Sequence, residues 1–228
     1  MAIGPENLYP VFVVFVVVVG VVGGVYSLVA KIRRRNAFQA LAGQLHLRYC
    51  AEDSGIPDRY SFLDTLSRGH SRYAANVLTG EYRGYDVLAF DFHYTTGSGK
   101  SQQHHRLGFF MLHLPRSFQE LKIYPENFLA KIGQTLGFED VDFESAAFSD
   151  AFTVRAADKK FAYDFCHARM MEYLLQHRSF AFEIEGECLA MGMEKLLAPE
   201  EVMWCLDRLI EIRELMPAYV LADDYGLR

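Results

Sequence analysis

The sequence lacks paired cysteines and lacks an excess of basic residues, and each absence excludes a class of protein. Its four cysteines are scattered and form no C-x-x-C pair, so neither a zinc site nor a redox pair is indicated. Single scattered thiols are usually small buried hydrophobic side chains. The formal net charge is −6, with 23 Lys and Arg against 29 Asp and Glu. Because clustered Lys and Arg supply the affinity for phosphate backbones, a nucleic-acid partner is not expected.

Complete catalytic and nucleotide-binding motifs are also missing. No G-x-S-x-G, H-E-x-x-H or dinucleotide fingerprint occurs in the chain. The segment 95–105, TTGSGKSQQHH, contains the Gly-Lys-Ser ending of a P-loop, but Tyr94 stands where the first glycine of that motif belongs. A strand-like run follows, instead of the helix whose N-terminus would hold phosphate. We therefore expect no nucleotide and no other cofactor, and interpret the segment as a polar hairpin loop.

Charge is absent from one long stretch, Val11 to Ala30, VFVVFVVVVGVVGGVYSLVA. A helix that rises about 1.5 Å per residue crosses a hydrocarbon core of about 30 Å with about 20 apolar residues, so this run predicts a transmembrane helix. A cleaved signal peptide would carry basic residues before its apolar core, whereas Glu6 precedes this one. The basic residues follow it, at Lys31, Arg33, Arg34 and Arg35. The positive-inside rule predicts a single-pass protein of the cell inner (plasma) membrane, with its N-terminus outside and its main domain in the cytoplasm.

The span also carries small residues at helical spacing. Gly20-x-x-x-Gly24 and Gly23-x-x-x-Ser27 lie on one helix face, where a second helix could approach closely. Glycine is common in membrane helices, so a packing role stays a hypothesis for Gly20, Gly23, Gly24 and Ser27. The basic cluster after the span would lie at anionic lipid headgroups, or would serve only as a stop-transfer signal: Lys31, Arg33, Arg34 and Arg35.

The remainder of the chain predicts a single α+β domain with an antiparallel sheet. We divide the sequence into a tail at 1–10, a transmembrane helix at 11–30, a basic juxtamembrane helix at 31–48 and a cytoplasmic domain at 49–228. The juxtamembrane helix is indicated by the 3–4 spacing of Phe38, Leu41, Ala42 and Leu45. Strands are expected at 73–82, 85–94, 105–114, 121–124, 141–143, 152–155, 180–185 and 188–193, the last two as a hairpin around Gly186. Helices are expected at 58–66, 125–136, 158–177 and from 199 to 217, and a loop at 51–57.

One group of side chains could bind a metal if the hairpin closes symmetrically over 95–103. His93 would then lie opposite His105, with Asp91 two residues along the same face, and cross-strand neighbours are about 5 Å apart. Two histidines and a carboxylate can ligate a metal. The register is assumed, however, and the histidines fall on the polar face, where solvated side chains are the simpler explanation. No metal is therefore predicted, and Asp91, His93 and His105 remain the candidates.

Three segments together resemble a family of uncharacterised bacterial single-pass membrane proteins. They are GEYRGYDVLAFDFHYTTGSGK at 80–100, FESAAFSDAFTVRAADKKFAYDFCHARMMEYLL at 143–175 and LIEIRELMPAYV at 209–220. The resemblance covers most of the chain from the membrane span onward. It implies a membrane-anchored bacterial domain, and it implies no activity, cofactor or catalytic residue.

The sequence thus favours a non-enzymatic interaction protein, whose partners are membrane lipids and other membrane protein subunits. In its most concrete form this is an accessory, assembly or structural subunit of a larger membrane complex, with respiratory and photosynthetic complexes as two options. Two alternatives stay open. One is a membrane-anchored metal-dependent hydrolase built on the histidine hairpin, and the other is a sensor domain for a small molecule or lipid.

Overall fold

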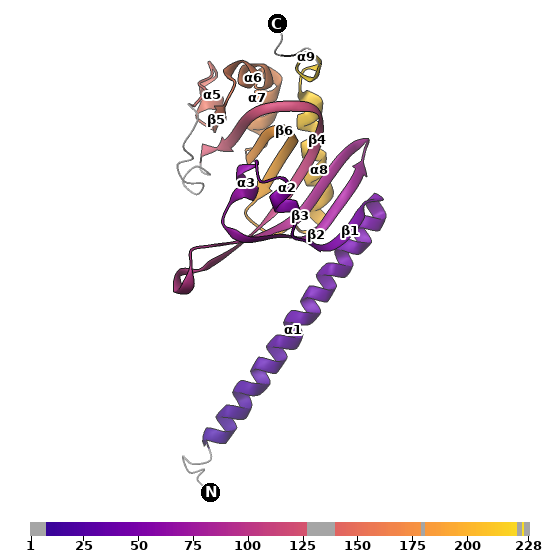
Figure 1. Ribbon diagram of the computed structural model, residues 1–228, viewed down its shortest axis with the longest axis vertical. Helices are drawn as coiled ribbons and strands as arrows, with labels where there is room; N and C mark the ends of the chain where they lie inside the picture. Colours follow the sequence, from indigo (N-terminus) through magenta and orange to yellow (C-terminus); the bar gives the residue numbers. More distant parts are fainter. Residues whose placement is uncertain (1–7, 127–139, 179–180, 223–224, 226–228) are drawn as a thin grey trace.

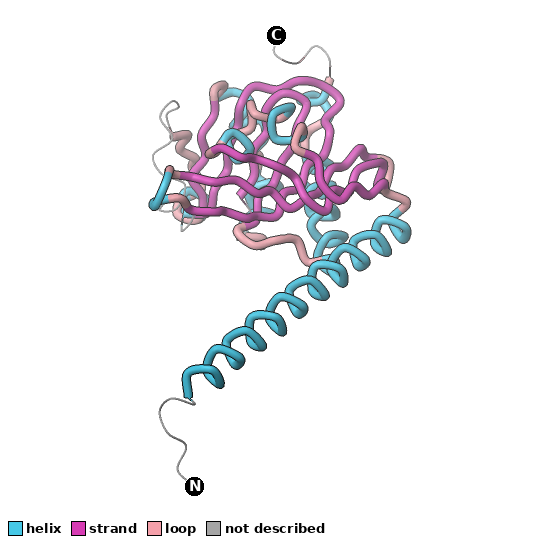
Figure 2. The backbone as a smooth tube through the Cα atoms, turned by 60° about the horizontal axis from the view of Figure 1, so that its bottom comes forward, coloured by secondary structure: helices cyan, strands magenta, loops and turns pink. Residues whose placement is uncertain are grey.

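A computed structural model describes residues 8–126, 140–178, 181–222 and 225, with the side chains of 8–12 excepted. One continuous helix, α1 (Leu8–Leu45), contains both the apolar run and the basic juxtamembrane segment. Figures 1 and 2 show α1 leaving the domain as a long unaccompanied helix. Its C-terminal turns pack on the domain through the expected stripe, since Phe38, Leu41 and Ala42 are buried and Leu45 is half-buried. The apolar side chains of the run favour a helix in lipid because the backbone must satisfy its own hydrogen bonds there.

The domain is built on an antiparallel sheet. Its strands are β1 (Arg48–Asp53), β2 (His70–Tyr82), β3 (Tyr85–Thr96), β4 (Gln103–Pro125), β5 (Phe152–Ala156) and β6 (Ala181–Met193). The order is β1-β2-β3-β4-β5, and β6 also pairs with β4. This confirms the α+β class with an antiparallel sheet. The segment expected to be a loop begins inside β1, which is an edge strand.

Helices cover the two faces of the sheet unequally. The larger core lies under the end of α1 and under α6 (Lys159–Phe165), α7 (Ala168–Gln176), α8 (Pro199–Leu215) and α9 (Ala218–Leu221). The smaller core lies under two short helices, α2 (Ile56–Arg59) and α3 (Asp64–Ser67). Another short helix, α5 (Ala146–Ser149), precedes β5. The alternation along β3 explains the two cores, because Val87 and Ala89 belong to the larger one and Leu88 and Phe90 to the smaller.

Two expected breaks in strands are absent from the structure. β4 runs without interruption through Pro115, although strands were expected to end before it and restart after it. The expected hairpin around Gly186 is instead one continuous strand, β6. Gly186 has a φ of +57° and lies opposite Phe118, at a point where the register between β4 and β6 shifts. Glycine suits this position because a left-handed backbone within a strand makes a bulge rather than a turn. The prediction of a hairpin here was wrong.

The helix expected over 158–177 is split. Asp158 caps its start, as its side chain accepts a hydrogen bond from the Lys160 amide, but α6 ends at Phe165 and α7 begins at Ala168. Met170 on α7 is fully buried in the larger core. The short strand expected at 141–143 is reduced to an isolated bridge between Asp140 and Arg155. The helix expected at 125–136 lies almost entirely outside the described residues.

Candidate functional site

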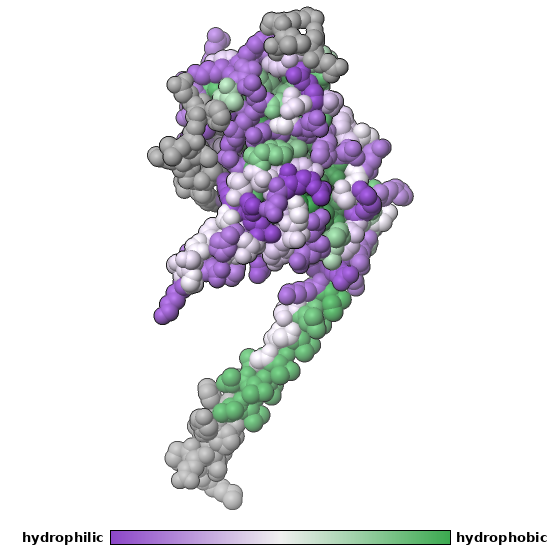
Figure 3. Space-filling model, in the orientation of Figure 1, coloured by the Kyte–Doolittle hydropathy of each residue, from purple (hydrophilic) through white to green (hydrophobic). Residues whose placement is uncertain are grey.

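Helix α1 exposes its side chains on every side over the apolar segment. The residues from Val13 to Arg33 are all exposed, and the helix is long and apolar enough to cross a membrane. Figure 3 shows this stem as the main apolar surface of the view, whereas the domain above it is largely polar. An added Cβ at Gly20, Gly23 or Gly24 would meet no atom within 4 Å. The Ser27 hydroxyl donates to the Gly24 carbonyl (2.9 Å), so the face formed by these small residues is open to a neighbour.

The stem is joined to the domain by an ion pair between the half-buried Arg34 and the buried Asp91 on β3. Asp91 is only 1% exposed, and both of its carboxylate oxygens accept from the Arg34 guanidinium, at 3.0 and 2.8 Å. The same Arg34 nitrogen donates to the Leu197 carbonyl (2.6 Å), and the Arg34 guanidinium lies 5.0 Å from the ring centroid of Phe38. Charge-assisted hydrogen bonds of this kind are stronger than neutral ones. We call this group, with Asn76, the Asp91 junction.

An asparagine with a left-handed backbone and a glycine complete the Asp91 junction. Asn76 has a φ of +51°, at a register shift in β2, and its amide donates to Asp91 (2.8 Å). Asparagine tolerates the left-handed region better than most residues, and a bulge re-aims a side chain. Gly108 lies opposite Asp91 on β4, and a Cβ there would come within 2.4 Å of the Leu197 side chain. The glycine thus lets the 195–197 segment approach, so that the Leu197 amide also donates to Asp91 (2.8 Å).

The structure separates the three metal candidates. The true register pairs His93 with Arg106 and Tyr94 with His105, one residue away from the symmetric closure assumed from sequence. Because side chains alternate along a strand, His93 and His105 therefore point to opposite faces of the sheet. His93 stacks on Tyr73 and His105 stacks on Tyr94, with ring centroids 4.6 and 4.7 Å apart. Asp91 is held by Arg34, so the three side chains do not converge as the assumed register would have required.

The basic cluster is likewise divided. Arg34 is committed to Asp91, which corrects its assignment to lipid headgroups, whereas Lys31, Arg33 and Arg35 are exposed on the helix. Sequence reasoning missed this role because the two partners are 57 residues apart. The sequence did contain a signal for this role: Asp91 is the one charged residue in the otherwise apolar run VLAFDF.

The hairpin tip has no P-loop geometry. Gly97 and Gly99 both have positive φ, and Gly99–Ser101 forms a short 3-10 turn between strands, with no helix after it. We expect that replacing Lys100 with alanine leaves nucleotide binding unchanged, because a cradle of amides at a helix N-terminus is missing here. Titration of ATP into the wild-type and Lys100→Ala proteins checks this. Micromolar ATP affinity that disappears in the variant would contradict our interpretation.

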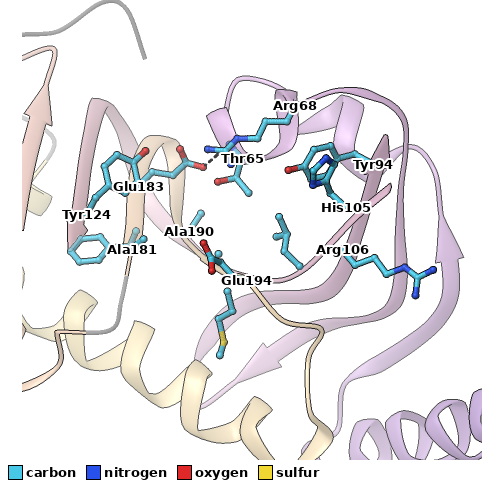
Figure 4. Close-up of a pocket in the computed structure, with 14 residues that line it drawn as sticks. Thr65, Arg68, Tyr94, His105, Arg106, Tyr124, Ala181, Glu183, Ala190 and Glu194 are labelled. Carbon is cyan, nitrogen blue, oxygen red and sulfur yellow. Dashed lines mark hydrogen bonds between the residues drawn. The ribbon is translucent and has the colours of Figure 1, made fainter. Parts of the chain in front are cut away.

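A separate cavity of about 350 Å³ lies on the α3 side of the sheet, between β6, the ends of β4 and the base of the hairpin. Figure 4 shows Glu183 and Tyr124 at one end and Tyr94 with His105 at the other, with Ala190 between them. Burial raises the pKa of the Glu183 carboxyl to about 7, and the charge on Asp64 adds to this rise. Sequence reasoning missed Glu183, although its acidic side chain stands in the apolar run AFEIEG.

Comparisons with known proteins add one likeness in fold. No family model matches the sequence, and a search of curated proteins finds no match. Among solved structures, the crystal structure of the mycobacterial trehalose monomycolate transport factor A, TtfA, matches with a TM-score of 0.59 and 15% sequence identity. The match covers 81% of this chain and 95% of that one. This chain therefore shares its fold with a protein named as a transport factor.

Proposed function

We propose that this protein is a membrane-anchored, non-enzymatic accessory subunit of a larger membrane complex, and that the complex serves transport. The observation that carries the proposal is the stem, which is exposed on every side and yet fixed to the domain by an ion pair to the buried Asp91. A tether alone needs only length and apolarity. A fixed junction also sets the angle between helix and domain, which matters when both must contact the same partner.

The likeness to TtfA supports the choice of transport over respiratory or photosynthetic assembly. That protein is named for its part in moving trehalose monomycolate, and the shared fold spans nearly all of it. At 15% identity the cargo does not carry over to this chain. A hydrolase has no support at the hairpin, because Asp91 is engaged by Arg34 and the two histidines lie on opposite faces.

The test is purification of the full chain from its native membrane in mild detergent, followed by identification of what accompanies it. We expect a polytopic membrane protein in fixed proportion to this chain, because the exposed face of α1 is apolar and open. A matched control is the same domain carried by an unrelated single-pass helix. A full chain that purifies alone, or with the same proteins as the control, would count against a partner recognised by α1.

The orientation gives a further prediction. The basic residues follow the span, so a reporter fused after Arg228 should lie in the cytoplasm. Paired fusions to a fluorescent protein that folds in the cytoplasm and to a phosphatase that needs the periplasm measure this directly. We expect fluorescence without phosphatase activity, and phosphatase activity alone would reverse the proposed topology.

A further inference from the structure

The cavity around Glu183 is formed because small side chains line its floor. Ala181, Ala190 and Gly192 on β6 leave the space that larger residues would fill. A Cβ at Gly192 would lie 3.6 Å from the Thr65 side chain, which is an ordinary contact, so the backbone does not require glycine there. The stacked rings of Tyr94 and His105 make the opposite wall. The cavity thus combines an apolar floor and an aromatic wall, at a size suited to a small molecule.

Glu183 is the unusual member of this lining. Its side chain is 4% exposed, and its Oε1 accepts a long hydrogen bond from the Thr65 amide (3.4 Å). Its Oε2 is fully buried and has no hydrogen-bond partner among the described residues. Burying a carboxylate is costly unless it is paired, and buried polar groups without partners are rare in folded proteins. The carboxylate therefore lacks a donor, and a ligand in the cavity supplies one when the side chain turns Oε2 toward it.

The surrounding charges indicate what kind of donor is missing. Lys122 lies across the strand pair from Glu183, but its ammonium group bonds to Asp64 and Glu120. Arg68, directly after α3, is a second cation that acts on Glu183, and Arg106 and Glu194 also line the cavity. The charged groups around the cavity, besides Glu183, are therefore three acids and three bases: Asp64, Glu120, Glu194, Lys122, Arg68 and Arg106. With Glu183 itself the site holds more negative than positive charge.

We propose that this cavity binds a small organic cation, whose ammonium group donates to Glu183 and whose apolar body lies between the floor and the Tyr94–His105 wall. An ammonium group supplies both the missing hydrogen bond and the missing positive charge. A neutral alcohol would supply only the first, and a carboxylate neither. This inference concerns a ligand of the domain and does not rest on the proposed membrane partner.

The ionisation of Glu183 gives this ligand a characteristic pH dependence. Burial and Asp64 raise its pKa to about 7, against the opposing influence of Lys122, the Thr65 amide and Arg68. An ammonium ligand binds the ionised carboxylate, so affinity should rise as pH increases through this value. Between pH 6 and pH 8 the ionised fraction grows about tenfold, and an amine with a pKa near that of lysine, about 10, stays protonated throughout. We therefore expect about tenfold tighter binding at pH 8 than at pH 6.

The experiment uses the full chain in lipid nanodiscs and three probes of matched shape: phenethylammonium, 2-phenylethanol and 3-phenylpropanoate. Titration calorimetry measures each at pH 6 and pH 8. Glu183→Gln removes the charge with little change in shape, and Gly192→Val fills the cavity without touching the carboxylate. Glu185→Gln is the control, because it removes a charge from the same strand outside this cavity. Heat that all variants share reports partition into the nanodisc and is subtracted.

We expect saturable binding of phenethylammonium that tightens about tenfold between pH 6 and pH 8, as the ionised fraction of Glu183 requires. Binding should be lost in Glu183→Gln and in Gly192→Val and kept in Glu185→Gln. Equal binding of the alcohol, or affinity for the amine that ignores pH, would overturn the assignment to a cation. Binding that survives both Glu183→Gln and Gly192→Val would place the ligand elsewhere. If no probe binds the wild type at millimolar concentration, the proposal is wrong for cations of this size.

Discussion

Replacing Arg34 with methionine is expected to lower the free energy of unfolding of the domain by about 3–5 kcal/mol. Asp91 is 1% exposed, and Arg34 is the cation bonded to it. Without Arg34 the buried charge of Asp91 keeps, among the described residues, only the Asn76 and Leu197 amides as donors, and loss of one partner of a buried pair typically costs that much. Methionine keeps the length and apolar volume of the arginine stem, so loss of packing contributes little. For a domain of this size, the midpoint of thermal unfolding should fall by roughly 6–20 °C.

The measurement can use the single tryptophan as its reporter. Trp204 lies on α8 in the domain, so its fluorescence follows unfolding of the domain and not of the stem. Arg33→Met and Arg35→Met are matched controls, because both remove a charge from an exposed position on the same helix. Each should change stability by less than about 0.5 kcal/mol.

A double-mutant cycle separates the ion pair from other causes. Asp91→Asn removes the buried charge, so in the Arg34→Met background it should restore part of the lost stability. If Arg34→Met is as mild as the two controls, or if Asp91→Asn adds its full cost to it, then the pair does not hold the stem to the domain. The stem angle would then be set by Phe38, Leu41 and Ala42 alone.

The sequence predicted most accurately those features that are determined by residues close together in the chain. The span could be predicted because a run of some twenty uncharged residues has few other uses, and the stripe from Phe38 to Leu45 because helical spacing fixes which side chains share a face. The boundary between the strands expected at 73–82 and 85–94 was also correct, and Arg83 and Gly84 form the two-residue turn there, both with positive φ. In each case neighbours in sequence decide the outcome.

The register of the β3–β4 hairpin shows where such reasoning stops. Six residues, 97–102, separate the paired Thr96 and Gln103, and the two positive-φ glycines with their 3-10 turn set this length. A slip of one residue exchanges the two faces, so the error moved His105 to the wrong side of the sheet. Turn geometry of this kind is not encoded in the hydrophobic alternation of the strands.

The Asp91 junction and the Glu183 cavity could not be predicted for a related reason. Each joins side chains from distant parts of the chain, such as Arg34 with Asp91 or Thr65 with Glu183. Both acids could have been noticed, because each interrupts an apolar strand pattern and a buried charge needs a partner. Their partners depend on which strands pair and on which helices cover them, which is a property of the whole fold.

Replacing Gly20 and Gly24 with leucine should leave insertion intact and abolish recovery of the membrane partner. The span stays apolar, so its transfer into lipid is unaffected. Each leucine side chain, however, would project from a face where even an added Cβ has no neighbouring atom within 4 Å. Association of helices in lipid depends on close van der Waals contact, which small residues permit. Packing defects of this kind cost roughly 1–3 kcal/mol by analogy with overpacked cores. Association should therefore weaken by about 5- to 150-fold.

The contrast with Val14→Leu decides what this loss means. Val14 is also exposed on the stem and lies outside the glycine face, so its substitution adds volume without obstructing that face. Both proteins are extracted in mild detergent, their membrane fractions are compared to confirm equal insertion, and the recovered partner is quantified relative to the chain. Because the stem is fixed to the domain through Asp91, a helix displaced at Gly20 and Gly24 would also move the domain away from its contacts. If both variants recover the partner equally, α1 is only an anchor, and the domain must hold the complex by itself.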